Sequence, residues 1–238
     1  MPEKTIALIP ARKGSKRVKD KNIRLLGEKP LISRTIENAI TAFPPSSIYL
    51  STNDERIYPI ADKYKINLIK RPEEVSADNS SMEAVIYNFL NSINFNCNIL
   101  LLQPTNPFRL PETTKEFLKV GINRIDSGHS DIVISVNESY EYIWICKEGS
   151  DKIKSSNKNS YLSRVFPNDP RRQEDRVPHY VENSSYYLFS SKHIKSKVDT
   201  LIKGKISCHV IPIVESIDIN TEQDITIAET YIKTRKFN

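Results

Sequence analysis

A basic loop that follows a short apolar run is the part of this chain best suited to chemistry. The run, Thr5–Pro10, is rich in β-forming residues and predicts a buried central strand. Gly14 allows the loop backbone to turn sharply and to approach a ligand closely. Clustered cations beyond the carboxyl end of a parallel strand are typical of a polyphosphate site, although a solvated basic loop is the alternative. The loop contains six basic residues and one acidic residue: Arg12, Lys13, Lys16, Arg17, Lys19, Lys21 and Asp20.

The distribution of charge favours a compact anionic ligand. The formal net charge is +6, from 35 basic and 29 acidic residues. The basic loop alone supplies most of this excess, so the remainder of the chain is almost neutral. Nucleic-acid binding requires basic residues spread along a face, and the sequence therefore argues against a nucleic-acid partner.

Length and cysteine content indicate the class of protein. The 238 residues can form one large α/β domain or two small ones, and we expect a single domain over residues 1–238. Cys97, Cys146 and Cys208 form neither a Cys-x-x-Cys pair nor a disulfide framework, which favours free thiols in a reducing compartment. We expect no signal peptide before Thr5, and the sequence has no apolar run near the ~18 residues of a membrane span. We expect a cytoplasmic protein with no membrane partner.

Strand-like and helix-like segments alternate along the chain. This alternation indicates βαβ units and a mostly parallel central sheet. Ser80 and Glu83 have the spacing of a capping box at one helix start. The predicted strands are 5–10, 47–51, 67–70, 99–102, 131–136, 185–190 and 206–213, and the predicted helices are 31–42, 55–64, one from about 80, one from 111 and one around 225–232.

The segment of residues 138–180 has a different character. Tyr140, Tyr142, Trp144 and Tyr161 lie among polar residues without helical spacing. We expect an inserted hairpin and loop region. An aromatic-rich insertion suits a subunit interface, and a local cluster under a long loop is the alternative.

Several motifs resemble one enzyme family. Pro10–Asn22 reads Pro-Ala-Arg-x-Gly-Ser-Lys-x-x-x-x-Lys-Asn, which resembles the signature of the acylneuraminate cytidylyltransferases, the synthetases of CMP-sialic acid and its legionaminic and pseudaminic acid relatives. The resemblance extends from residue 6 to about residue 224. Further matching segments are Ser51–Asp54, Arg71–Glu74, Gln103–Arg109, Arg171–Gln173, Glu182–Tyr187 and Ser216–Asn220.

The resemblance implies a fold and an activity. The fold is a three-layer Rossmann-like nucleotidyltransferase with a mostly parallel sheet and an inserted dimerisation region, hence a homodimer. The activity joins CTP to a nine-carbon 2-keto sugar acid, giving the CMP-sugar and pyrophosphate. The segment Gln103–Arg109 favours N-acylneuraminate or legionaminate as the substrate, and pseudaminic acid is an alternative. Because Asn53, Ser184 and Asn220 depart from the family pattern, a non-catalytic nucleotide- or sugar-binding homologue is a further alternative.

The resemblance also assigns residues to roles. Arg12, Lys21 and Asp218 are implied as catalytic. Asp218 is implied as a ligand of Mg²⁺, with Mn²⁺ as a substitute, and the neutral amide makes Asn220 a doubtful ligand. The implied CTP-binding residues are Ala11, Arg12, Gly14, Ser15, Lys16, Lys21, Asn22 and Arg71, and the implied sugar-binding residues are Gln103, Arg172, Asn183 and Tyr187.

Overall fold

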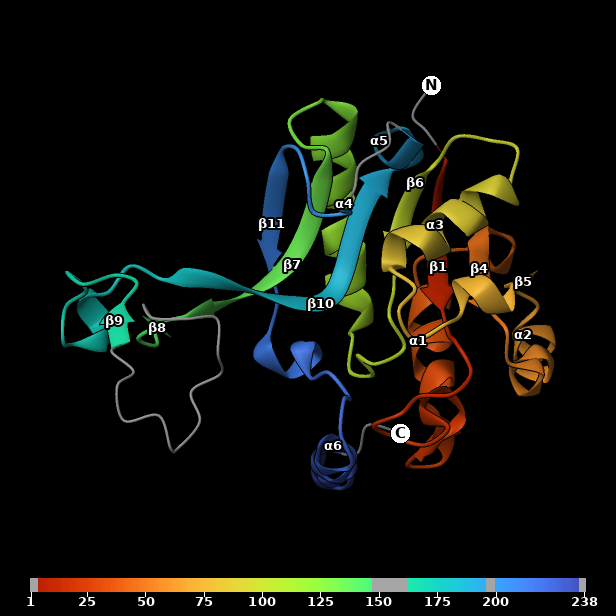
Figure 1. The fold of residues 1–238 in the computed structure, drawn as a ribbon, viewed down its shortest axis with the longest axis horizontal. Coiled ribbons are helices and arrows are strands. Elements are labelled where there is room, and N and C mark those ends of the chain that lie inside the picture. The colour runs from red at the N-terminus through yellow and green to blue at the C-terminus, as the bar shows by residue number, and fades with distance from the viewer. Residues whose placement is uncertain (1–3, 147–161, 196–199, 236–238) are drawn as a thin grey trace. The chain divides into compact units, whose positions relative to one another are not determined.

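The structure, a computed structural model, describes residues 4–146, 162–195 and 200–235. Within these residues the main sheet has seven strands in the order β11-β7-β10-β6-β1-β4-β5 (Figure 1). Neighbours β6, β1, β4 and β5 are parallel, as are β7 and β11, and β10 is antiparallel to β6. The strands are β1 (Thr5–Pro10), β4 (Ile48–Thr52), β5 (Asn67–Lys70), β6 (Asn98–Leu101), β7 (Ile132–Ser139), β10 (His179–Ser190) and β11 (Ile206–Val210).

Helices cover both faces of this sheet. One apolar cluster joins the sheet to α1 (Leu31–Ile40), α2 (Tyr58–Tyr64) and α4 (Pro111–Asp126). A second cluster joins the opposite face to α3 (Met82–Asn91) and α5 (Ser191–Lys195). Every residue of β6 is buried, as expected of a central strand that is covered on both sides. The predicted three-layer α/β fold with a mostly parallel sheet is confirmed.

A third apolar cluster anchors the basic loop. Val18, in the middle of that loop, is fully buried against Leu26 and Ile219. The same cluster contains the inner face of α6 (Glu222–Arg235) and the start of α1. Leu26 belongs to a small ribbon formed by β2 (Leu25–Leu26) and β3 (Lys29–Pro30). One loop residue therefore holds the cations close to the segment that contains Asp218.

Some element boundaries differ from the sequence-based expectation. Ser81, rather than Ser80, caps α3, since its hydroxyl accepts the Ala84 N–H at 3.2 Å. Glu83 instead accepts the Leu201 N–H at 2.6 Å, so the predicted capping box is wrong.

Two other segments are interrupted by 3₁₀ helices. The expected helix over 55–64 begins as a 3₁₀ turn, η3 (Glu55–Ile57), before α2. The expected strand over 206–213 ends at Val210, and η6 (Ile213–Ser216) follows Pro212, which has no N–H to donate to a ladder.

The chain divides into two compact units. The first contains residues 1–137 and 182–238, and the second contains Glu138–Val181. The second unit covers almost the same residues as the expected insertion, of which 147–161, including Tyr161, lie outside the described residues.

Aromatic and guanidinium groups stack within the second unit. β8 (Trp144–Cys146) pairs with β9 (Leu162–Arg164) as an antiparallel hairpin. The guanidinium groups of Arg164 and Arg176 lie 3.7 Å and 3.9 Å from the Tyr142 ring centroid. A subunit-interface role for this unit stays a prediction.

Among residues 4–146, 162–195 and 200–235, no helix has the length and apolar character needed to cross a membrane.

Candidate active site

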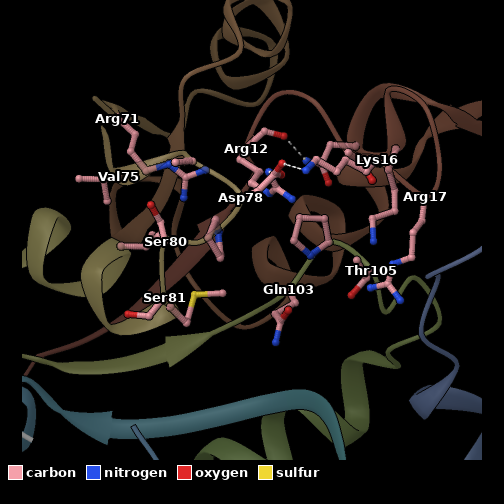
Figure 2. Close-up of a pocket in the computed structure, with 18 residues that line it drawn as sticks. Arg12, Lys16, Arg17, Arg71, Val75, Asp78, Ser80, Ser81, Gln103 and Thr105 are labelled. Atoms are coloured by element: carbon pink, nitrogen blue, oxygen red, sulfur yellow. Dashed lines mark hydrogen bonds and ion pairs between the residues drawn. The ribbon is translucent and has the colours of Figure 1, made fainter. Parts of the chain in front are cut away.

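A pocket of about 440 Å³ lies at the carboxyl edge of the parallel strands (Figure 2). Its walls come from the segments that follow β1, β5 and β6, where open α/β sheets bind ligands. Among the described residues that line it, five side chains are basic and one, Asp78, is acidic. The basic side chains are Arg12, Lys16, Arg17, Lys21 and Arg71.

Hydrogen bonds from the end of β4 hold the start of the basic loop. The Ala11 N–H donates to the Ser51 carbonyl at 2.9 Å. Asn53 Oδ1 accepts the Lys13 N–H at 2.8 Å, and Asn53 Nδ2 donates to Glu73 Oε2 at 3.0 Å. An aspartate could accept the first bond but could not donate the second, so the asparagine suits this site.

An ion-pair chain holds the other end of the loop. Arg56 Nη2 lies 2.8 Å from Asp54 Oδ2 and 2.7 Å from Asp20 Oδ1. The Asp54 side chain is almost fully buried, and its hydrogen bonds with Arg56 hold the pKa of that carboxyl below its usual value. Asp20 has a left-handed backbone, with φ at 53°, and it directly precedes Lys21. Arg56 therefore helps to fix the position at which Lys21 enters the pocket.

Lys21 and Asn22 connect the loop to its surroundings. Lys21 Nζ donates to the Ile219 carbonyl at 2.8 Å, and burial lowers the pKa of this ammonium group, opposed by the charge of Asp218. Asn22 Nδ2 donates to the Arg12 carbonyl at 3.0 Å. A half-buried cation of this kind interacts more strongly with a bound anion than a fully solvated one does.

Arg71 supplies a buried positive charge to the pocket wall. Its Nε donates to Ser76 Oγ at 3.0 Å, while its Nη2 is buried and has no hydrogen-bond partner. Desolvation, together with the nearby charge of Arg12, lowers the pKa of Arg71 to about 10, so the group stays charged at neutral pH. A buried unpaired donor is costly, and a ligand in the pocket would satisfy it.

Asp218 lies beside the basic loop with one free oxygen. Its Oδ2 accepts from Asn220 Nδ2 at 2.5 Å, whereas its Oδ1 is buried and has no hydrogen-bond partner. Asn220 Oδ1 in turn accepts from Arg17 Nη2 at 3.2 Å. Throughout the described part of the chain, no group of three or more His, Cys, Asp or Glu side chains could hold a metal ion. A single carboxylate with a free oxygen fits Mg²⁺ that arrives bound to phosphates, because such sites need only one or two protein carboxylates.

The residues expected to bind sugar are in different environments. Gln103 lines the pocket. Asn183 and Tyr187 do not, and both have protein partners: Asn183 Oδ1 accepts from Ser135 Oγ at 2.6 Å, and the Tyr187 hydroxyl donates to Glu182 Oε1 at 2.5 Å. Arg172 belongs to the second unit, where its exposed guanidinium lies 3.7 Å from Glu174. The sugar-binding roles stay predictions.

Two of the expected CTP-binding residues, Ala11 and Gly14, do not line the pocket. Ala11 is buried, and Gly14 is exposed with φ at 77° in a conformation that favours glycine. Neither is among the residues that form the pocket wall, whereas Ser15, Lys16 and Asn22 are.

Sequence reasoning assigned no role to two buried charged residues, which hold the loop after β6 and the start of α4. Arg109 donates to the carbonyl groups of Gln103 at 2.8 Å and Asn106 at 2.7 Å, and so fixes the loop after β6. Glu215 is fully buried and accepts the Leu110 N–H at 2.9 Å at the start of α4. Arg109 could have been suspected, because an arginine after two closely spaced prolines has many free carbonyl groups within reach.

Comparison with known proteins agrees with this geometry. A family model described as Cytidylyltransferase matches residues 6–202. The chain belongs to the cytidylyltransferase family. This confirms the family that the motifs from Pro10 onward had suggested.

Two relatives match this chain over almost its whole length. A CMP-N,N'-diacetyllegionaminic acid synthase of Legionella pneumophila is 33% identical over 94% of each chain. An N-acylneuraminate cytidylyltransferase of Escherichia coli is 38% identical over 97% of this chain, which spans only 52% of that relative. A solved CMP:2-keto-3-deoxy-manno-octonic acid synthetase complexed with CTP has the same fold, with a TM-score of 0.66, 14% identity and coverage of 97% of this chain and 99% of that one.

Proposed function

We propose that this cytidylyltransferase transfers CMP from CTP to a nine-carbon 2-keto sugar acid, of the N-acylneuraminate or legionaminate type, and releases pyrophosphate. The observation that carries the proposal is the pocket with five cations at the carboxyl edge of β1, β5 and β6, in a chain of this family. A nucleoside triphosphate has about four negative charges, which these cations can balance.

The proposed reaction is an in-line displacement. The anomeric hydroxyl oxygen of the sugar forms a bond to the α-phosphorus and loses its proton to solvent, while the bond from that phosphorus to the bridging oxygen of the β-phosphate breaks and pyrophosphate leaves. Catalysis of such a transfer is mostly positioning and electrostatic stabilisation. Arg12, Lys16 and Lys21 are proposed to hold the phosphate oxygens, and Arg71, with its buried free donor, is proposed to bind near the cytidine.

Mg²⁺, or Mn²⁺ in its place, is part of the proposal. Asp218 would hold the ion through its free Oδ1, and the bound ion would neutralise phosphate charge. Asn220 orients Asp218 by donating to its other oxygen, so the chain offers one carboxylate where a pair would be expected.

The direct test is pyrophosphate release. The purified protein is incubated with CTP and, in turn, N-acetylneuraminic, legionaminic and pseudaminic acid, with ATP and UTP in parallel as nucleotide controls. The proposal expects release that requires both CTP and one of the first two acids. Release only with pseudaminic acid would correct the substrate, and CTP binding without release with any acid would favour the non-catalytic alternative.

The oligomeric state and location complete the proposal. Large apolar side chains of the second unit are exposed, including Trp144 and Ile145, each 51% exposed, and Leu162, 50% exposed. We propose that this unit forms a homodimer contact and that the enzyme works in the cytoplasm. Sedimentation equilibrium at micromolar concentration tests the first part, and a monomer there would exclude the dimer.

A further inference from the structure

Asp78 binds the same cations that a substrate phosphate needs. Its Oδ1 lies 2.5 Å from Arg12 Nη1, and its Oδ2 forms an ion pair with Lys16 Nζ (Figure 2). Each carboxylate oxygen therefore contacts a different cation, which is the arrangement that two phosphate oxygens would make. These hydrogen bonds from Lys16 and Arg12 hold the pKa of Asp78 below its usual value, so the carboxylate is charged at neutral pH.

The ion pairs do little to hold the fold together. The side chains of Lys16 and Asp78 are 75% and 41% exposed, and exposed ion pairs stabilise a protein only slightly. Asp78 belongs to a short segment between η4 (Glu73–Val75) and α3. Bonds that do not involve the Asp78 carboxylate fix this segment, including Ser76 N–H to the Glu73 carbonyl at 2.9 Å and Ser80 Oγ to the Glu74 carbonyl at 2.9 Å. The carboxylate can thus leave the cations while the segment stays in place.

We propose that Asp78 is an internal counter-ion, which occupies Arg12 and Lys16 in the free protein and is displaced when the triphosphate of CTP or the product pyrophosphate binds. The inference rests on the proposed function, since it concerns the same pocket. It identifies Asp78 as a positioning residue with two effects. Asp78 keeps the two cations in place before the nucleotide arrives, and its return to them after the reaction favours the departure of pyrophosphate.

The size of the effect follows from the competition. The apparent Kd of a ligand equals its intrinsic Kd divided by the fraction of protein that is in the binding-competent state. Here the competent state is the one in which Asp78 has released Arg12 and Lys16. Because two exposed ion pairs must open, the protein with Asp78 released should be about 3 to 30 times less populated than the protein with both ion pairs formed. Removing the carboxylate should strengthen binding by the same factor.

The experiment measures binding of inorganic pyrophosphate by titration calorimetry. Wild type, Asp78→Asn and the control Glu74→Gln are compared. Glu74 is an exposed residue of the adjoining η4 and does not line the pocket, so the control removes one negative charge without freeing Arg12 or Lys16. We expect Asp78→Asn to bind pyrophosphate about 3- to 30-fold more tightly and Glu74→Gln to change affinity less than 2-fold. Steady-state rates should show a lower KM for CTP and stronger product inhibition in Asp78→Asn, with no rise in kcat.

The outcomes separate this inference from the proposed function. If wild type binds CTP and pyrophosphate but Asp78→Asn binds them equally or more weakly, Asp78 is not a counter-ion and the inference fails alone. If Glu74→Gln gains as much affinity for pyrophosphate as Asp78→Asn, the gain is a general effect of net charge and the counter-ion inference fails. If wild type binds neither ligand, the proposed function fails and the inference with it. Melting curves of all three proteins check that the variants are folded.

Discussion

Restoring a second carboxylate at position 220 should make the stability of the free protein depend on a divalent cation. In the structure, Asn220 Nδ2 donates to Asp218 Oδ2 at 2.5 Å, and Asn220 Oδ1 accepts from Arg17 Nη2 at 3.2 Å. Asn220→Asp replaces the donated hydrogen bond with a second negative charge beside Asp218. Two carboxylates about 4 Å apart repel by about 4 kcal/mol at an effective dielectric constant of 20.

Nearby cations offset part of this repulsion. Arg17 contacts the new carboxylate directly, and Lys21 is close enough to Asp218 for the two charges to interact. We therefore expect the free energy of unfolding in EDTA to fall by about 1–2 kcal/mol, within the usual range for a single substitution. A chain of this size changes Tm by about 2–4 °C per kcal/mol, so Tm should fall by about 2–8 °C.

The assay is thermal unfolding without nucleotide, in EDTA and in a Mg²⁺ series. Mg²⁺ at 100 times its Kd adds about 2.7 kcal/mol of stability, which should restore the Tm of Asn220→Asp. Wild type, with one free oxygen at Asp218, should respond little to Mg²⁺ alone. Asn220→Ala is the control, because it loses the donor without gaining charge and should be destabilised with no response to Mg²⁺. An Asn220→Asp protein that is as stable as wild type in EDTA, or that ignores Mg²⁺, would refute the reasoning.

Four further predictions concern the basic side chains. Arg12→Ala and Lys21→Ala should each lower kcat/KM for CTP by about 10²–10³, since each loses a preorganised contact to phosphate, and near-normal kinetics would show that the loop is only a solvated surface. Arg71→Met should raise KM for CTP about 10- to 100-fold, because it removes the proposed charge-assisted bond to CTP, worth about 1.5–3 kcal/mol. Tm should change little, because loss of the bond to Ser76 is offset by removal of a buried unpaired donor; a lower Tm with unchanged KM would make Arg71 purely structural. Arg56→Gln should lower kcat about 10-fold by releasing the loop end, with wild-type kinetics as the contrary result. Arg56 lowers the pKa of Asp54, so the Arg56–Asp54 interaction stabilises the fold above the usual pKa of 3.8, and this stability is lost as pH falls below that value. In acid unfolding curves, the free energy of unfolding of Arg56→Gln should therefore fall less with decreasing pH than that of wild type.

The spacing of apolar residues predicted most strands and helices of the main sheet well, because this spacing is a property of short segments of sequence. β1 and β5 have the predicted bounds, and α1 begins at the predicted Leu31. Contacts between distant segments could not be read from these periods. The pairing of Arg12 with Asp78 spans 66 positions, and no local signal specifies which acid meets a given cation.

Backbone conformation shows a similar limit. The sequence indicated that Ser184 stands where the family motif has glycine. The structure supplies the reason for that preference, since Ser184 has φ at 60°, in the left-handed region. The Ser184 hydroxyl oxygen lies 3.2 Å from the Tyr187 hydroxyl oxygen, within hydrogen-bond distance, and glycine could not make this contact. The motif gave the position of the turn, whereas the hydrogen bond that accompanies the serine depends on the folded chain.

The place of β10 in the sheet has a consequence for the order in which the chain folds. β6 and β7 are successive strands in the sequence, yet the later β10 lies between them in the sheet. As the chain leaves the ribosome, β1, β4, β5 and β6 can already pair with one another, because all four precede residue 102. The inner edges of β6 and β7 stay open to other strands until residues up to 190 have emerged. Completion of the core is therefore a late step, governed by long-range closure of the chain more than by local helix formation.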